Sequence, residues 1–219
     1  MGLNEGNIQK FLDWTYDKAL NGIPGSDTVY ELANSYQSKH STNDKAIDSL
    51  IRWQQSKAGV NGFAAGLGGI VVMPITIPTN LASVMYMQMR MIAAIAHIRG
   101  YDLKDDQVQT FVYACLTGQS ASDVVKQSGI IIASKIGEAQ IKRIPGEAIK
   151  QINQKVGFRL LTKFGEKGAV NLGKMVPFLG GVVGATFDAS TTYVIGKAAK
   201  KTFIEGGYDN DDRIIIDIW

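Results

Sequence analysis

The sequence predicts an all-α fold, a single helical domain built around two glycine-rich apolar helical hairpins. Three observations carry this prediction. Apolar residues recur at three- and four-residue spacings through most of the 219-residue chain. Glycine and proline fall between these periodic stretches, where they mark turns. In addition, residues 58–89 form a run of thirty-two residues without a charge.

Three helices are expected in the N-terminal part, near residues 6–20, 27–39 and 43–57. The first carries Ile8 and Phe11 on one face, at the spacing typical of a half-buried helix. A GIPG turn at residues 22–25 separates the first two helices. Ser26 and Thr42 are the expected N-caps of the second and third, because a hydroxyl oxygen can accept a hydrogen bond from the first turn.

The charge-free run is long enough for a membrane span, but Pro74 and Pro78 interrupt it. A helix, a sharp turn and a second helix fit it better. Its last part, residues 85–91, alternates methionine with other residues as a strand would. The alanine-rich continuation does not alternate, so we expect one helix over residues 79–98, buried on several faces. The methionines then pack in the core, or line an adaptable hydrophobic groove.

Four more helices are expected, near residues 104–117, 120–137, 146–164 and 172–202. Gly100, Gly118 and Pro145 punctuate them. An acidic linker then leads into IIIDIW at the C-terminus, which is either a short strand or a docking tail. The expected division is therefore a helical domain over residues 1–208 and a tail over residues 209–219.

Small residues four positions apart predict close helix packing in both apolar segments. The candidate packing residues are Gly62, Gly66, Gly180 and Gly184. Asp188 continues the second stripe, and a carboxylate on a close-packed face needs a partner. Arg90, in the methionine-rich helix, is the candidate. We therefore predict a buried ion pair between Arg90 and Asp188 that serves packing specificity rather than chemistry.

The net charge of +3 is unevenly distributed, because residues 135–174 carry nine bases and three acids. This block lies between two apolar, glycine-rich segments, which suits contact with anionic lipid headgroups. The alternative is an ordinary solvated helix face. The candidate membrane-facing bases are Lys142, Arg143, Lys150, Lys155, Arg159 and Lys163.

No cofactor, metal or nucleic acid is expected. Residues 168–175 approximate a phosphate-binding loop, but Met175 replaces the magnesium-binding Ser or Thr. His97 lies near Asp102, which more simply belongs to the start of the next helix. Cys115 has apolar neighbours and no activating base, so it reads as a core thiol. The basic block lacks the interleaved aromatic residues of a nucleic-acid surface.

The compartment is expected to be the cytoplasm. A lone cysteine suits a reducing environment, and the N-terminal residues show neither the basic nor the apolar region of a signal peptide. With the apolar segments, this places the protein at the inner face of the membrane, either peripheral or inserted through its hairpins.

Several motifs resemble the EcsC family of bacteria. They are GLGGIVVMPITIPTN (66–80), QMRMIAAIA (88–96), GYD (100–102), VPFLGGVVGATFD (176–188) and IG (195–196). The resemblance covers roughly residues 15–205, although Asn80 stands where the family often has an acid. It implies a helical, membrane-associated protein without an agreed molecular activity. Some members are encoded beside an ABC transporter implicated in secretion and competence.

Three classes of function follow. The first is a non-enzymatic protein that binds an anionic membrane surface and acts through a membrane or protein partner, in transport or secretion. The second is a soluble domain that binds a lipid or another hydrophobic ligand in a methionine-lined pocket. The third is a hydrolase-like enzyme that uses Asp188 and Arg90. The first is preferred, because no catalytic constellation is found in the sequence and the basic block flanks apolar segments.

Overall fold

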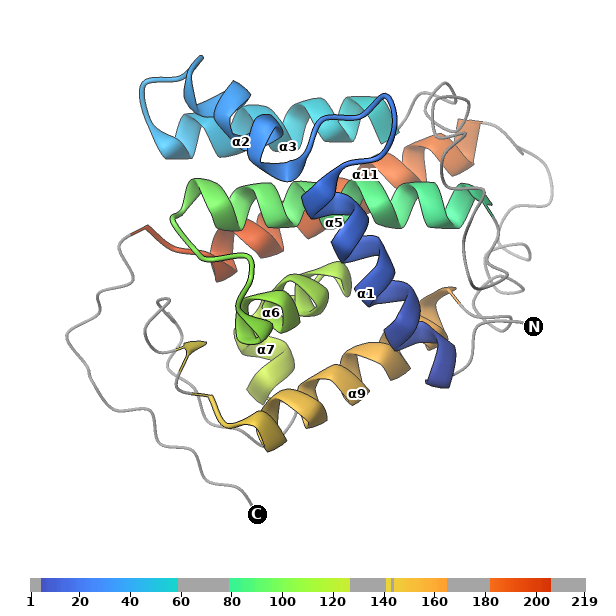
Figure 1. Ribbon diagram of the computed structural model, residues 1–219. Coiled ribbons are helices and arrows are strands. Elements are labelled where there is room, and N and C mark those ends of the chain that lie inside the picture. The colour runs from blue at the N-terminus through green and yellow to red at the C-terminus, as the bar shows by residue number, and fades with distance from the viewer. Residues whose placement is uncertain (1–4, 59–78, 127–140, 143, 165–181, 206–219) are drawn as a thin grey trace.

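The computed structural model describes residues 5–58, 79–126, 141–142, 144–164 and 182–205 (Figure 1). Over these residues it holds eight helices and no strand, which confirms the all-α fold. The helices are α1 (Glu5–Asn21), α2 (Val29–Gln37), α3 (Asn43–Ala58), α5 (Thr79–Ile98), α6 (Asp106–Leu116), α7 (Ala121–Lys126), α9 (Gly146–Phe164) and α11 (Val182–Thr202).

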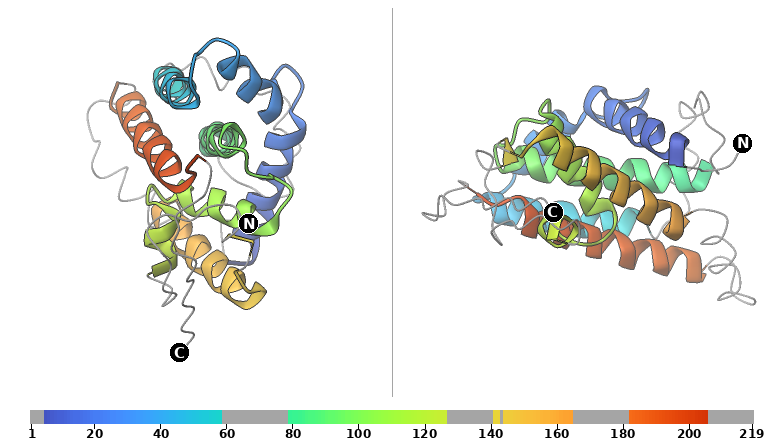
Figure 2. Two further views of the ribbon diagram at one scale, coloured as in Figure 1. Left: turned by 90° about the vertical axis from the view of Figure 1, so that its left-hand side faces the viewer. Right: turned by 90° about the horizontal axis from the view of Figure 1, so that it is seen from below.

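Helix α5 lies at the centre of the described fold, in contact with α1, α2, α3, α6 and α11 (Figure 1, Figure 2). Its methionines are all buried: Met85, Met87, Met89 and Met91. A helix that is apolar on every side belongs in a core, where no face is left for water. The prediction of one buried helix is therefore confirmed, and these methionines pack in the core.

Helices α3 and α11 run antiparallel and pack closely. Gly196 faces Ile51, whereas Lys200, one turn later, pairs with the Asp48 carboxylate 2.9 Å away, at an earlier turn of α3. Ion pairs also join the end of α5 to α3 and to the residues just after α11. Arg99, just beyond α5, contacts both Asp44 at 2.8 Å and Glu205 at 3.1 Å. The buried Gln88 side chain of α5 donates to Thr192 of α11 at 3.2 Å.

A second group of helices, α6, α7 and α9, lies below α5 in Figure 1. Helix α6 contacts α5, α9 and α11, and α9 also packs against α1. Gly100 and Gly118 precede α6 and α7 with φ angles of +90° and +85°. Because side chains disfavour this left-handed conformation, glycine is suited to both turns. The helix ends expected at these two glycines are confirmed.

The start of α2 differs from the expectation. Thr28, rather than Ser26, is its N-cap. The Thr28 hydroxyl accepts a hydrogen bond from the Glu31 backbone amide, and the Glu31 carboxylate accepts one from the Thr28 backbone amide. This capping box satisfies two amides that would otherwise lack partners, which favours Thr28 over Ser26 as the N-cap. Thr42 does cap α3, because its hydroxyl accepts a hydrogen bond from the Lys45 amide at 3.3 Å.

Some expectations fall outside the described residues and stay predictions. They concern Gly62, Gly66, Gly180, the phosphate-loop-like residues 168–175, and the division at residue 208 with its tail. Gly184 lies in the first turn of α11. Among the helices that are described, none combines the length and the apolar character needed to cross a bilayer.

Candidate functional site

Helix α9 carries most of the described part of the basic block and is amphipathic. Ala148, Ile152, Val156 and Leu160 recur every four residues and are buried against the core. The opposite face bears exposed polar and basic side chains. Phe158 interrupts it, with 59% of its surface exposed. An aromatic ring on the solvent side of a basic helix is the feature that distinguishes α9 from an ordinary solvated helix.

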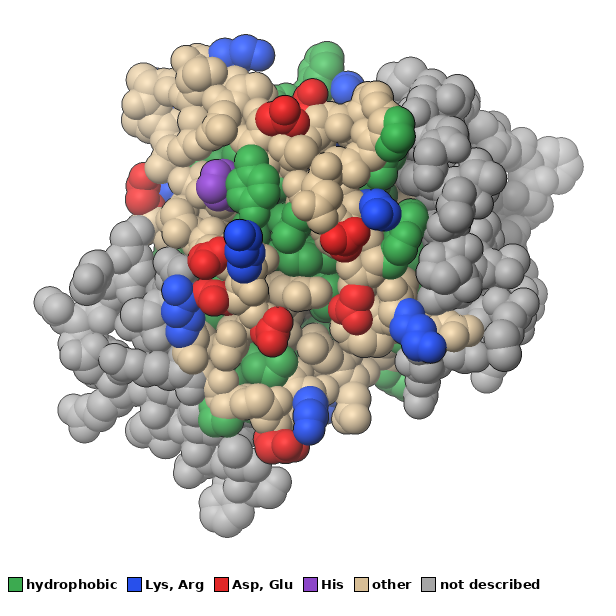
Figure 3. All heavy atoms as spheres, in the orientation of Figure 1, with side chains coloured by type: hydrophobic (Ala, Val, Ile, Leu, Met, Phe, Trp, Pro, Cys, Tyr) green, Lys and Arg blue, Asp and Glu red, His purple; other side chains and the backbone are tan. Residues whose placement is uncertain are grey.

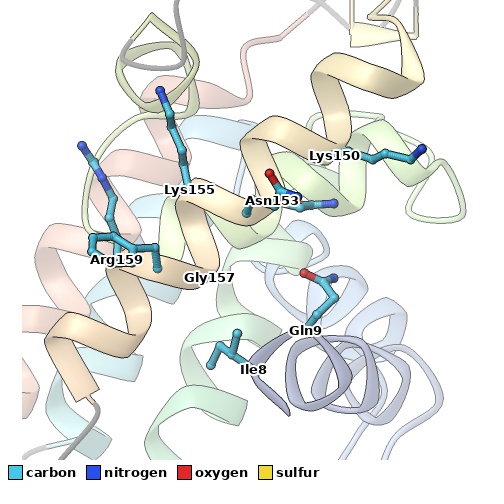
Figure 4. A pocket seen from close by; sticks show the side chains of 9 residues that line it. Ile8, Gln9, Lys150, Asn153, Lys155, Gly157 and Arg159 are labelled. Atoms are coloured by element: carbon cyan, nitrogen blue, oxygen red, sulfur yellow. The ribbon is translucent and has the colours of Figure 1, made fainter. Parts of the chain in front are cut away.

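An open pocket of about 910 Å³ lies where α9 meets α1 (Figure 4). Its described lining residues are Ile8, Gln9, Lys150, Asn153, Gln154, Lys155, Gly157, Phe158 and Arg159. Gly157 lets the helices approach closely, because a Cβ there would lie 3.2 Å from Cγ2 of Ile8. This lining contains three bases and no acid, so its potential favours anions.

The three bases do not point at one spot. Lys155 and Arg159 extend together from one side of α9, whereas Lys150 extends away from them (Figure 4). The Lys150 ammonium also pairs with Glu147 at 3.2 Å, and Arg159 donates to the side chain of Gln119. A bound phosphate needs converging donors. The arrangement therefore fits an extended anionic surface better than a single small anion.

The remaining candidate bases have separate surroundings. Lys142 pairs with Asp105 at 3.1 Å, which joins the segment before α9 to the start of α6. Arg143 and the side chain of Lys163 lie outside the described part of the structure. The described basic surface therefore consists of Lys150, Lys155 and Arg159, together with exposed Phe158; we call it the α9 surface.

The described side chains that line the pocket are basic, amide-bearing or apolar. The described lining residues include no Ser, Cys, His, Asp or Glu, so the ionisable groups that they offer are the side chains of Lys150, Lys155 and Arg159. The Oδ1 atom of Asn153 is buried without a hydrogen-bond partner, so it can accept from a ligand that carries a donor.

Arg90 is buried, with 8% of its surface exposed, and its described contacts lie toward α2. Its guanidinium donates to the Ser26 hydroxyl at 2.8 Å and lies 3.7 Å from the Asp27 carboxylate. Gln88, two residues earlier, faces α11 instead. The side chain of Asp188 lies outside the described structure, so the pairing of Arg90 with Asp188 stays a prediction.

His97 lies seven residues, or two helical turns, beyond Arg90, on the same side of α5. Its ring meets Tyr30 of α2 edge to face, with ring centroids 5.0 Å apart. Burial lowers the pKa of His97, so the ring is neutral at pH 7. Among the residues described, no three His, Cys, Asp or Glu side chains gather closely enough to hold a metal ion.

Cys115 is a core thiol, as predicted. It is fully buried, donates to the Thr202 hydroxyl at 3.3 Å, and has its pKa raised to about 12 by burial. The thiolate is the reactive form, so Cys115 should resist a thiol reagent such as DTNB in the folded protein and react fully in denaturant. Absorbance measures both rates. Rapid reaction under native conditions would contradict this placement.

Sequence reasoning missed two parts of the site. Phe158 lies eight residues after Lys150 and four after Gln154, so the helical period alone places it on the exposed face. The signal was present but weak, because one phenylalanine on a polar face is common. The contribution of α1, through Ile8 and Gln9, carries no local signal, since about 150 residues separate it from α9 in the chain.

The fold and this site define an all-α protein with a buried, methionine-rich central helix and a basic, partly apolar surface helix. The chain belongs to the EcsC protein family, whose family model matches residues 11–204. The resemblance inferred from the glycine-rich motifs is thereby confirmed over nearly the range expected. No curated protein and no solved structure matches the chain.

Proposed function

We propose that this protein is a non-enzymatic, peripheral membrane protein that binds the anionic inner face of the cytoplasmic membrane and acts through a membrane or protein partner. A role accessory to transport or secretion is part of the proposal. The observation that carries it is the α9 surface, where three bases and an exposed Phe158 lie on one helix. Anionic lipid matches the bases, and the headgroup–acyl boundary accepts the aromatic ring.

The energies favour a reversible contact. Each base near an anionic bilayer contributes about 1 kcal/mol, and burial of apolar surface adds roughly 25 cal/mol per Å². Neither term alone anchors a protein, so a basic face and an apolar contact must act together. The α9 surface supplies both on one helix.

The placement of the helix ends agrees with this proposal. Residues 59–78, which contain no charged residue, connect the end of α3 to the start of α5. Both ends lie toward the side of the molecule where α9 ends and α11 begins (Figure 1). The apolar part of the sequence is thus attached on the side of the fold that the C-terminal half of the basic helix also reaches.

Vesicle binding tests the proposal directly. The purified chain is mixed with vesicles of phosphatidylcholine alone or with phosphatidylserine, and bound protein is separated by flotation at low and high salt. We expect flotation only with the anionic vesicles and a loss at high salt, because salt screens the headgroup attraction. Absence of flotation with either vesicle would overturn the proposal.

Lys155→Gln should weaken binding to the anionic vesicles about fivefold, because it removes about 1 kcal/mol of attraction. Its matched control is Lys45→Gln, which makes the same charge change at an exposed lysine of α3, on the opposite edge of the fold from α9 (Figure 1). The control should bind as the wild type does. Equal losses in both variants would mean that net charge, and not the α9 surface, governs binding.

The hydrophobic-ligand alternative gains no support from the described core. The methionines expected to line a pocket are buried side by side in α5, and the open pocket lies elsewhere, at α1 and α9. An acyl ligand that co-purifies with the protein and is found by mass spectrometry of a solvent extract would revive it.

A further inference from the structure

Helix α11 exposes two apolar side chains beside the α9 surface. Tyr193 and Val194 are 40% and 50% exposed, although Ile195 and Ala199 on the other side of the helix are fully buried. Single apolar residues on a surface are common and need no explanation. These two are adjacent, and they lie on the part of α11 that is connected to α9 through the turn before α7.

The two exposed regions are continuous. A Cβ on Gly118, in the turn before α7, would lie 3.5 Å from Cγ1 of Val194, so that turn touches α11. The next residue, Gln119, accepts a hydrogen bond from Arg159 of α9. Helix α7 contacts both α11 and α9, and the three follow one another along one side of the molecule (left view of Figure 2). The path from Val194 to Arg159 thus passes through one turn.

Basic side chains accompany this path. The Lys197 ammonium lies 5.6 Å from the centre of the Tyr193 ring, and Lys201 lies 3.6 Å from Asp123 of α7. Lys126 of α7 lies close enough to Asp123 to act on its charge, and Lys155 extends together with Arg159 from α9. Asp48 contacts Lys197, and Asp123 contacts Lys201. Along the path from Tyr193 to Arg159, the bases named here outnumber these two acids.

We infer that the outward face of α11 and the α9 surface form one lipid-facing surface, with Tyr193 and Val194 entering an anionic phospholipid bilayer. The inference rests on the proposed function and adds a second apolar contact to it. Tyrosine favours the boundary between headgroups and acyl chains, where the ring is buried and the hydroxyl is wet. Lysine stems lie along apolar surface while their ammonium groups reach the phosphates. A second copy of this chain would bring like charges together.

A fluorescent probe at residue 194 tests this inference. Val194→Cys is labelled with the environment-sensitive dye NBD and mixed with vesicles of phosphatidylcholine and phosphatidylserine. Cys115 stays unlabelled because it is fully buried. The matched control is the same label in Trp53→Cys, since Trp53 is 51% exposed and, like Tyr193, has a lysine over its ring. Trp53 lies on α3 and is not among the residues that make up the proposed surface.

We expect the probe at residue 194 to brighten and shift to the blue on vesicle binding, and the probe at residue 53 to stay unchanged. A probe in Phe158→Cys, on the α9 surface, separates the two claims. If it responds and the probe at residue 194 does not, the α11 contact is wrong and the proposed function stands. If no labelled or wild-type protein binds vesicles, both fail. A response at residue 53 alone would place the bilayer at α3 and overturn the inference.

A variant without a label gives an independent measurement. Val194→Asp places a like charge against the anionic headgroups, and we expect binding to weaken by about fivefold or more. Trp53→Asp is the control and should bind as the wild type does. Because both positions are exposed, both variants should keep the wild-type melting temperature. Equal binding by Val194→Asp and wild type would contradict the α11 contact.

Discussion

Replacing Phe203 with alanine should lower the free energy of unfolding by about 3–5 kcal/mol, the usual cost of deleting a buried aromatic side chain. Phe203 is fully buried just beyond α11, and its ring meets Tyr101 edge to face with centroids 5.0 Å apart. The change removes this pair and leaves a cavity under the last turn of α11. Urea denaturation followed by circular dichroism measures the loss.

Phe158→Ala is the matched control for that prediction. It deletes the same side chain from the exposed face of α9, so the free energy of unfolding should change by less than about 0.5 kcal/mol. Vesicle binding should show the reverse order, because only Phe158 belongs to the α9 surface. Similar losses of stability in the two variants would contradict the burial assigned to Phe203.

Gly196→Ala should also destabilise the protein, by about 1–3 kcal/mol, because it forces extra volume into a packed interface. A Cβ on Gly196 would lie 2.8 Å from Cγ1 and 2.9 Å from Cγ2 of Ile51. These atoms lie near the Ile51 backbone and cannot swing away. The clash opposes the gain of roughly 1 kcal/mol that alanine brings over glycine within a helix. The sign of the net change in the free energy of unfolding therefore shows how tightly α3 and α11 pack.

Two comparisons make the Gly196 experiment specific. Gly146→Ala, in the first turn of α9, meets no neighbouring atom within 4 Å and should be neutral or stabilising. Ile51→Ala removes both clashing carbons, so the double variant should lose less stability than the two single changes added together. Strict additivity, or a stable Gly196→Ala protein, would contradict the close approach of the two helices.

Local periodicity predicted the helices well because their apolar residues repeat with the helical turn. The clearest case is α5, where the alternating methionines suggested a strand and the alanines after them decided for a helix. The cap of α2 was wrong by two residues. Ser26 and Thr28 are chemically similar, and only the reciprocal bond to Glu31 distinguishes them. That pairing is visible in the sequence as a Thr followed three residues later by a Glu.

Long-range partners could not be predicted in the same way. The contacts of the buried Arg90 with Ser26 and Asp27 were not predicted, because these residues lie more than sixty positions earlier in the chain. No periodicity links such distant residues. The same limit applies to the surface joining α11 to α9, which depends on a turn at Gly118 and Gln119 placed between them by the fold. Composition indicated a basic block, and only the structure shows which apolar side chains accompany it.

The packing of α3 against α11 also has a consequence for synthesis on the ribosome. Ile51 and Gly196 meet although 145 positions separate them in the chain. At about 5–20 residues per second, the nascent chain waits roughly 7–30 s between making the two halves of this interface. During that interval the apolar side of α3 that receives α11 has no permanent cover. Nascent chains that stall before α11 should therefore depend on chaperones to stay out of aggregates.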